Sequence, residues 1–133
     1  MIGRLACYAL LLVLAALVAA VQADREAERN PALAALVPQP LRNTALVPLT
    51  IEALAAKDPQ AALAQARKLV QRRPVPAEHL TLLAMAEGSA GREGKADVII
   101  EQAARRGWRE PVAQEAMLGF ALNAGDRAEA ARR

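Results

Sequence analysis

Three turn-forming segments of this chain recur at one constant step, and this regular spacing constrains the fold more than any other feature of the sequence. The segments run from Lys57 to Ala62, from Gly91 to Ala96 and from Gly125 to Ala130. The apolar residues that precede the closing alanines at a fixed distance keep the same step, and they are Leu49, Leu83 and Met117. Because two independent positions share one period, the sequence predicts a repeated structural unit.

Apolar residues between the turns follow helical spacing. In the first unit they are Leu46, Leu49, Ala53, Ala62, Ala66, Leu69 and Val70, and in the second they are Leu80, Leu83, Ala84, Ala96, Ile99, Ile100 and Ala103. Asp58 before Pro59 is typical of a helix start, and Gly91 and Gly125 suit the left-handed position after a helix end. The pattern predicts an all-α fold of antiparallel helical hairpins over about 42–75, 76–109 and 110–133, the last one incomplete.

From Arg42 to Arg133 the chain resembles the tetratricopeptide repeat, whose unit has this length and a small residue where its two helices cross. The features that carry the resemblance are the spacing, the turn glycines, the small Ala62, Ala96 and Ala130, and Pro74 at the close of the first unit. The chain departs from the family pattern in two ways. The early aromatic residue is replaced by Leu46, Leu80 and Gln114, and Trp108 stands where a closing proline is expected.

The resemblance implies a short solenoid whose first helices line a concave face that holds an extended peptide or a partner helix. The family's groove positions correspond here to Val47, Ile51, Glu78, Thr81, Met85, Glu115, Gly119 and Asn123. This mixed, shallow set favours a modest protein interface over a small-molecule pocket. The alternative that stays open is a structural role, in which the repeats self-associate within a membrane scaffold.

Residues 1–23 contain a membrane-directed segment, since Leu5 to Val21 is uncharged and almost wholly apolar. As a helix this segment reaches about 25 Å, at the lower limit for a bilayer core. Val21-Gln22-Ala23 satisfies the small-x-small rule of signal peptidase, so secretion to the periplasm after cleavage following Ala23 is one interpretation. The preferred interpretation is an uncleaved single-pass anchor of the cytoplasmic membrane.

Arg4 is the only charged residue before the apolar segment, so the positive-inside rule predicts a cytoplasmic amino terminus and an exported remainder. Residues 24–41, with three prolines, are expected to form a stalk or linker ahead of the repeats. From Asp24 onward the chain has 16 basic and 14 acidic residues. This near balance argues against nucleic acid as the main partner.

No group of residues predicts catalysis, a cofactor site or a metal site. The one cysteine, Cys7, lies in the apolar segment, and the one histidine, His79, is expected to form an exposed helix-start pair with Glu78. Ser89 lies at a predicted helix end and lacks the strand-to-helix elbow of a nucleophilic serine. We therefore expect a binding protein and no enzyme.

The sequence carries two further expectations about packing. Trp108 is predicted to fill the gap between the second and third hairpins, since the chain has few other large residues. The third hairpin stops shortly after Ala130, so Met117, Leu118 and Phe120 are expected to lack their cover. Truncation of a longer chain and completion by another chain are both open explanations.

Overall fold

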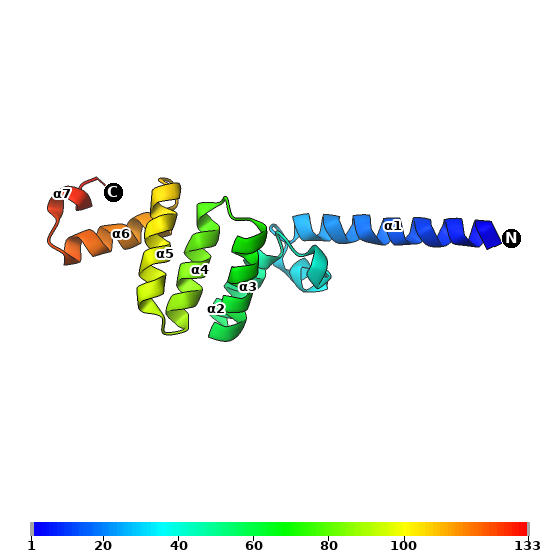
Figure 1. Cartoon of the computed structure of the whole chain (residues 1–133), viewed down its shortest axis with the longest axis horizontal. Helices are drawn as coiled ribbons and strands as arrows, with labels where there is room; N and C mark the ends of the chain where they lie inside the picture. The colour runs from blue at the N-terminus through cyan, green and yellow to red at the C-terminus, as the bar shows by residue number, and fades with distance from the viewer. Residues whose placement is uncertain (1, 133) are drawn as a thin grey trace. The chain divides into compact units, whose positions relative to one another are not determined.

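The computed structural model describes residues 2–132, and within that range every regular element is helical. The predicted all-α class is therefore confirmed. The chain divides into two compact units, residues 1–49 and residues 50–133, and Figure 1 shows the order of their helices. Alanine and leucine dominate these helices, and both are strong helix formers.

The first unit contains the long helix α1 (Ile2–Glu26), two 3-10 turns, η1 (Pro31–Leu36) and η2 (Gln39–Leu41), and the start of helix α2. Its buried core consists of Ala27, Ala34, Val37 and Ala45, with Ala23, Leu33, Leu41 and Leu49 packed around them. The segment expected to be a stalk thus has a small core of its own. By contrast, the side chains of α1 from residue 4 to residue 19 are all exposed.

The second unit is built from helical hairpins. Helix α2 (Leu46–Ala55) crosses into it from the first unit, and α3 (Pro59–Arg72), α4 (Ala77–Ser89), α5 (Glu93–Arg106), α6 (Pro111–Asn123) and the short α7 (Arg127–Ala130) follow. The step from α3 to α5 equals the step from α4 to α6, at the helix starts and at the helix ends. It also equals the step from Ala62 to Ala96, so the period read from the sequence is a period of the helices.

The turns repeat with the same step. Gly91 and Gly125 have φ angles of 74° and 73°, which confirms the left-handed positions predicted for them. Lys57, the equivalent position in the first hairpin, has φ of 56° although it carries a side chain. Asp58 and Asp126 then cap the following helices, since their carboxylates accept hydrogen bonds from the amides of Ala61 and Glu129.

Small residues let neighbouring helices approach closely. One core cluster of the second unit contains Ala62, Leu63, Ala66 and Ala86, and the other contains Leu80, Ala84, Ile100, Ala103, Ala104 and Ala113. At the crossing of α4 and α5, a Cβ placed on Gly88 would lie 3.8 Å from the Cβ of Ala96. At the other end of this pair, a Cβ on Gly107 would lie only 2.5 Å from the Cβ of Ala77. The position of Gly107 therefore has no room for a side chain.

Trp108 does not fill the junction of the second and third hairpins, so that prediction is wrong. Its side chain is 75% exposed. The junction is held instead by Gln114, whose amide nitrogen donates to the backbone oxygens of Ala104 and Gly107. At Gly107 itself the backbone passes so close to Ala77 that this part of the junction has no space for a side chain.

Candidate interaction surfaces

The first helices of the three hairpins present one equivalent position to solvent. Ile51, Met85 and Gly119 occupy the same position of the repeat on α2, α4 and α6. Ile51 and Met85 are 52% and 47% exposed, and a Cβ placed on Gly119 would meet no atom within 4 Å. All three belong to the predicted groove, and we call them the first-helix column.

The other predicted groove residues divide by exposure. Glu78, Glu115 and Asn123 are exposed on α4 and α6. Val47 is half-buried and belongs to the first unit. Thr81 is only 3% exposed, and its hydroxyl donates to the backbone oxygen of Ala77.

The burial of Thr81 corrects its assignment to a partner-binding surface. The neighbouring Leu80 lies in the core cluster that α4 forms with α5 and α6. Because α4 contacts both α3 and α5, only a small part of its surface is accessible to solvent. Spacing along one helix does not reveal how much of that helix its neighbours cover.

A pocket of about 210 Å³ lies between α5 and α6. Its apolar residues are Val98, Met117 and Phe120, and Asp97 and Glu101 give it an acidic rim. Phe120 is exposed, as predicted for this incomplete hairpin, whereas Met117 and Leu118 are half-buried. The sequence does not reveal the α5 side of the pocket, because the charged residues Asp97 and Glu101 are typical of a helix face that is exposed to water.

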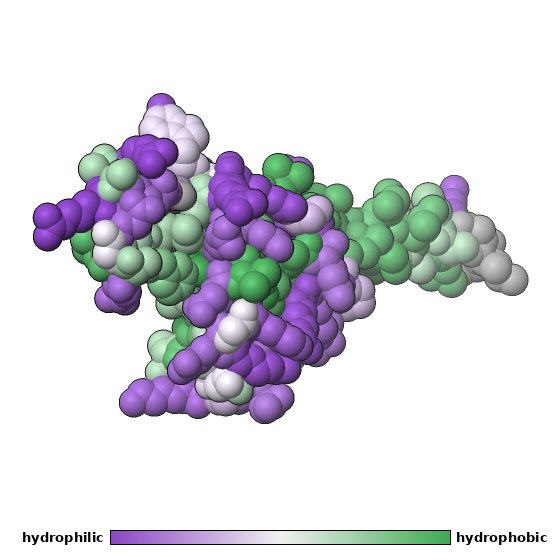
Figure 2. Space-filling view, turned by 60° about the vertical axis from the view of Figure 1, so that its left-hand side comes forward, coloured by the Kyte–Doolittle hydropathy of each residue, from purple (hydrophilic) through white to green (hydrophobic). Residues whose placement is uncertain are grey.

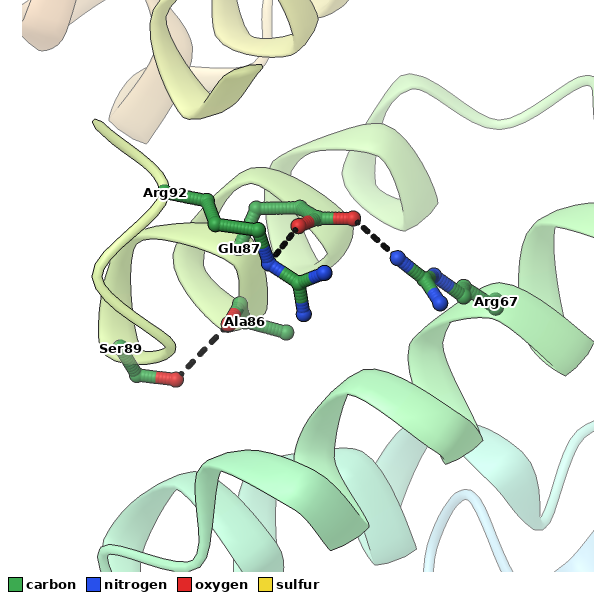
Figure 3. A network of polar contacts seen from close by, with 5 residues as sticks. All are labelled: Arg67, Ala86, Glu87, Ser89 and Arg92. Carbon is green, nitrogen blue, oxygen red and sulfur yellow. Dashed lines mark hydrogen bonds and ion pairs between the residues drawn. The ribbon is translucent and has the colours of Figure 1, made fainter. Parts of the chain in front are cut away.

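A buried carboxylate connects three parts of the second unit (Figure 3). Oε1 of Glu87 on α4 accepts a hydrogen bond of 3.0 Å from Nη2 of Arg67 on α3. Oε2 of Glu87 lies 2.8 Å from Nε of Arg92, which precedes α5, in an ion pair without hydrogen-bond geometry. Since both arginines engage the carboxylate, Glu87 acts as a structural link.

The residues considered for chemistry have structural partners. His79 is buried, and its Nδ1 lies 2.8 Å from the backbone oxygen of Arg73, so the expected exposed pair with Glu78 is wrong. The Ser89 hydroxyl donates to the backbone oxygen of Ala86 at the end of α4 (Figure 3). Among residues 2–132, no group of three or more His, Cys, Asp or Glu side chains is arranged to hold a metal ion.

In the first unit, the carboxylate of Asp24 joins the end of α1 to the start of α2. Oδ1 accepts hydrogen bonds from the backbone amides of Asn43 at 2.8 Å and Ala45 at 3.0 Å, and Oδ2 accepts one from Thr44 at 3.1 Å. These amides precede the first turn of α2 and have no partner within that helix. Asp24 is therefore a capping residue for α2, although it lies at the end of α1 and far from α2 in the sequence. Its position within a run of charged residues does not predict this role.

Helix α1 is the one stretch within residues 2–132 that is long and apolar enough to cross a membrane, and a signal sequence has the same properties. Figure 2 shows its visible side as a continuous hydrophobic surface. The exposed large apolar residues around this helix include Leu5, Leu10, Leu11, Leu12, Val13, Leu14, Leu17 and Val18.

Comparison of the chain with protein-family models, with curated proteins and with solved structures finds no match.

Proposed function

We propose that this chain is a membrane-anchored interaction module of the tetratricopeptide-like type, which binds a peptide or helix of a partner protein and catalyses no reaction. The observation that carries the proposal is the first-helix column. Ile51, Met85 and Gly119 recur with the period of the fold, at positions where the resemblance implies partner contact. Ile51 and Met85 are exposed, and Gly119 is half-buried with open space where a side chain would lie.

The column offers a modest apolar contact with charged edges. Full burial of an isoleucine or methionine side chain contributes about 1.5–3 kcal/mol, so Ile51 and Met85 together supply part of the affinity of a weak interface. Gly119 adds a flat site at which a partner backbone can approach closely. The exposed Glu78 and Glu115 favour a partner segment that carries basic residues.

The test is crosslinking in membranes followed by capture of the tagged chain. The double variant Met85→Glu, Gly119→Arg is expected to lose its captured partner and to keep its helicity, because both positions have room for the new side chains. The matched control is Lys68→Glu, Lys95→Glu, which changes charge on exposed positions of α3 and α5. Loss of the partner only in the control, or in neither variant, would refute the first-helix column.

We favour an uncleaved anchor for α1, in a single-pass arrangement with the following residues exported. Two observations support retention of the segment. The helix continues through Val21 to Ala23 and ends only at Glu26, and Asp24 is fixed by three backbone amides. Signal peptidase cleaves after a small-x-small site, and here the bond after Ala23 lies inside a continuous helix whose end is fixed through Asp24.

Two measurements test this arrangement. Intact mass of the membrane-bound protein is expected to include residues 1–23, and a reporter fused after Arg133 is expected to be active only when exported. A mass that begins at Asp24 would show cleavage. Activity of a strictly cytoplasmic reporter at the same position would reverse the topology.

Self-association is the second candidate function, and the exposed side of α6 favours it. Phe120 is exposed there and lines the pocket together with Val98 of α5. Light scattering of the detergent-solubilised chain is expected to give a mass that rises with concentration if this face pairs copies, and Phe120→Glu is expected to abolish the rise. A constant monomer mass for the parent would remove this candidate.

A further inference from the structure

Two loops lie side by side at one end of the second unit. One loop, residues 73–76, connects α3 to α4, and the other, residues 107–110, connects α5 to α6. Nη1 of Arg106 donates a hydrogen bond of 2.9 Å to the backbone oxygen of Pro74, and Gly107 passes closely against Ala77. These contacts hold the loops together, and we call their combined surface the loop patch.

The loop patch exposes two large apolar side chains. Val75 is 83% exposed and Trp108 is 75% exposed. The guanidinium carbon of Arg109 lies 4.3 Å from the centre of the Trp108 ring, so a cation–π contact holds the indole on the surface. Exposed apolar residues grouped in this way mark an interaction site more often than isolated ones do.

The charges around these side chains are predominantly positive. The arginines in or next to the two loops are Arg72, Arg73, Arg105, Arg106 and Arg109. Of the nearby carboxylates, Glu78 is exposed, Glu101 pairs with Arg105, and Glu110 is buried and accepts a hydrogen bond from the amide of Ala113. Arginines at helix ends are favoured by the helix dipole, but the dipole does not account for an exposed tryptophan and valine between them.

We propose that the loop patch docks on the surface of an anionic phospholipid membrane. Tryptophan and arginine are the side chains that suit the boundary between lipid headgroups and acyl chains, because the indole is amphipathic and the guanidinium binds phosphate. Val75 and Trp108 project from adjacent turns, which suits shallow insertion into a fluid surface. The chain also carries a helix of membrane-spanning length, so insertion of this helix would bring the chain to a bilayer.

Trp108 is the only tryptophan of the chain, so its fluorescence reports on this patch alone. The full chain is reconstituted into phosphatidylcholine vesicles with or without about one third phosphatidylglycerol. With the anionic lipid, we expect a blue shift of the emission and quenching by brominated acyl chains, both reversed at high salt. Emission of a water-exposed indole in both vesicle types would overturn the proposal, as would a blue shift that only an added polyglutamate peptide produces.

Matched variants separate the patch from general charge effects. Arg105→Gln, Arg109→Gln removes two charges from the patch and is expected to lower the ratio of docked to undocked protein about 25-fold, since each basic residue contributes about fivefold. Lys95→Gln, Arg127→Gln removes two charges at the other turns and is expected to leave the ratio unchanged. An equal drop in both pairs would overturn the proposal.

This inference rests on the proposed membrane location and is independent of the first-helix column. Flotation of the chain with both vesicle types reports insertion of α1, and the Trp108 emission reports docking of the patch. Loss of flotation therefore contradicts the anchor, whereas flotation without a lipid-dependent emission change contradicts only the patch.

Discussion

Replacement of Asp24 tests the joint between α1 and α2 most directly. Its side chain is buried and accepts three backbone hydrogen bonds, from Asn43, Thr44 and Ala45. Asp24→Ala removes all three acceptors. Water can replace the carboxylate at Asn43, which is exposed, and at Thr44, which is half-buried, but it cannot reach Ala45, which is fully buried.

The expected cost follows from these differences in exposure. A buried amide left without an acceptor costs about 1–3 kcal/mol, and loss of a helix cap costs about 1 kcal/mol. Asp24→Ala is thus expected to destabilise the joint by about 2–4 kcal/mol. Asp24→Asn keeps one oxygen for Asn43 and Ala45, so its cost is expected to be about 1–2 kcal/mol.

Hydrogen exchange of the full chain in lipid nanodiscs measures the effect at the amides concerned. In Asp24→Ala, exchange at residues 43–45 is expected to accelerate about 30- to 900-fold, with a smaller increase in Asp24→Asn. Glu28→Ala is the control, because Glu28 is an exposed acid of the same charged run. Unchanged protection in Asp24→Ala would refute the role of the carboxylate as a cap.

Four other substitutions test the packing and the turns of the second unit by thermal unfolding. Ala96→Leu is expected to cost ~1–3 kcal/mol, because the larger side chain overpacks the crossing of α4 and α5, and equal stability would place the crossing elsewhere. Gly107→Ala is expected to cost about 1–3 kcal/mol by collision with Ala77, whereas Gly94→Ala, which has open space, is expected to be neutral or mildly stabilising. Lys57→Gly is expected to stabilise by about 0.5–1 kcal/mol, since glycine relieves the left-handed strain; a lower melting temperature would mean that the lysine side chain contributes more than the strain costs.

Local features of the sequence were predictable where one short segment contains the whole cause. The left-handed Gly91 and Gly125 and the Asp58 cap follow from residue chemistry within a single turn, and the structure has all three. The residue type of Lys57 gives no indication of a left-handed backbone. Only its place in the register of the repeat points to that conformation.

Long-range contacts decided the features that the sequence left open. The burial of His79 and Thr81 depends on the helices that surround α4, and Trp108 is exposed while Gln114 makes the contacts of the junction. Glu87 has the sequence context of an ordinary helix-end acid, and only the fold brings Arg67 of α3 and Arg92, which precedes α5, within ion-pair distance of it.

The sequence by itself determined the helices, their period, the turns and the apolar length of α1, because helix propensity, caps and hydrophobic spacing act between residues that are close in the chain. Only the tertiary structure decided which side chains reach solvent and which amides need a distant acceptor. Asp24 shows the physical reason, since its partners lie 19 to 21 residues away and pair with it only when the chain folds back on α1. Burial and hydrogen bonding at such distances belong to the packed molecule, and no local pattern records them.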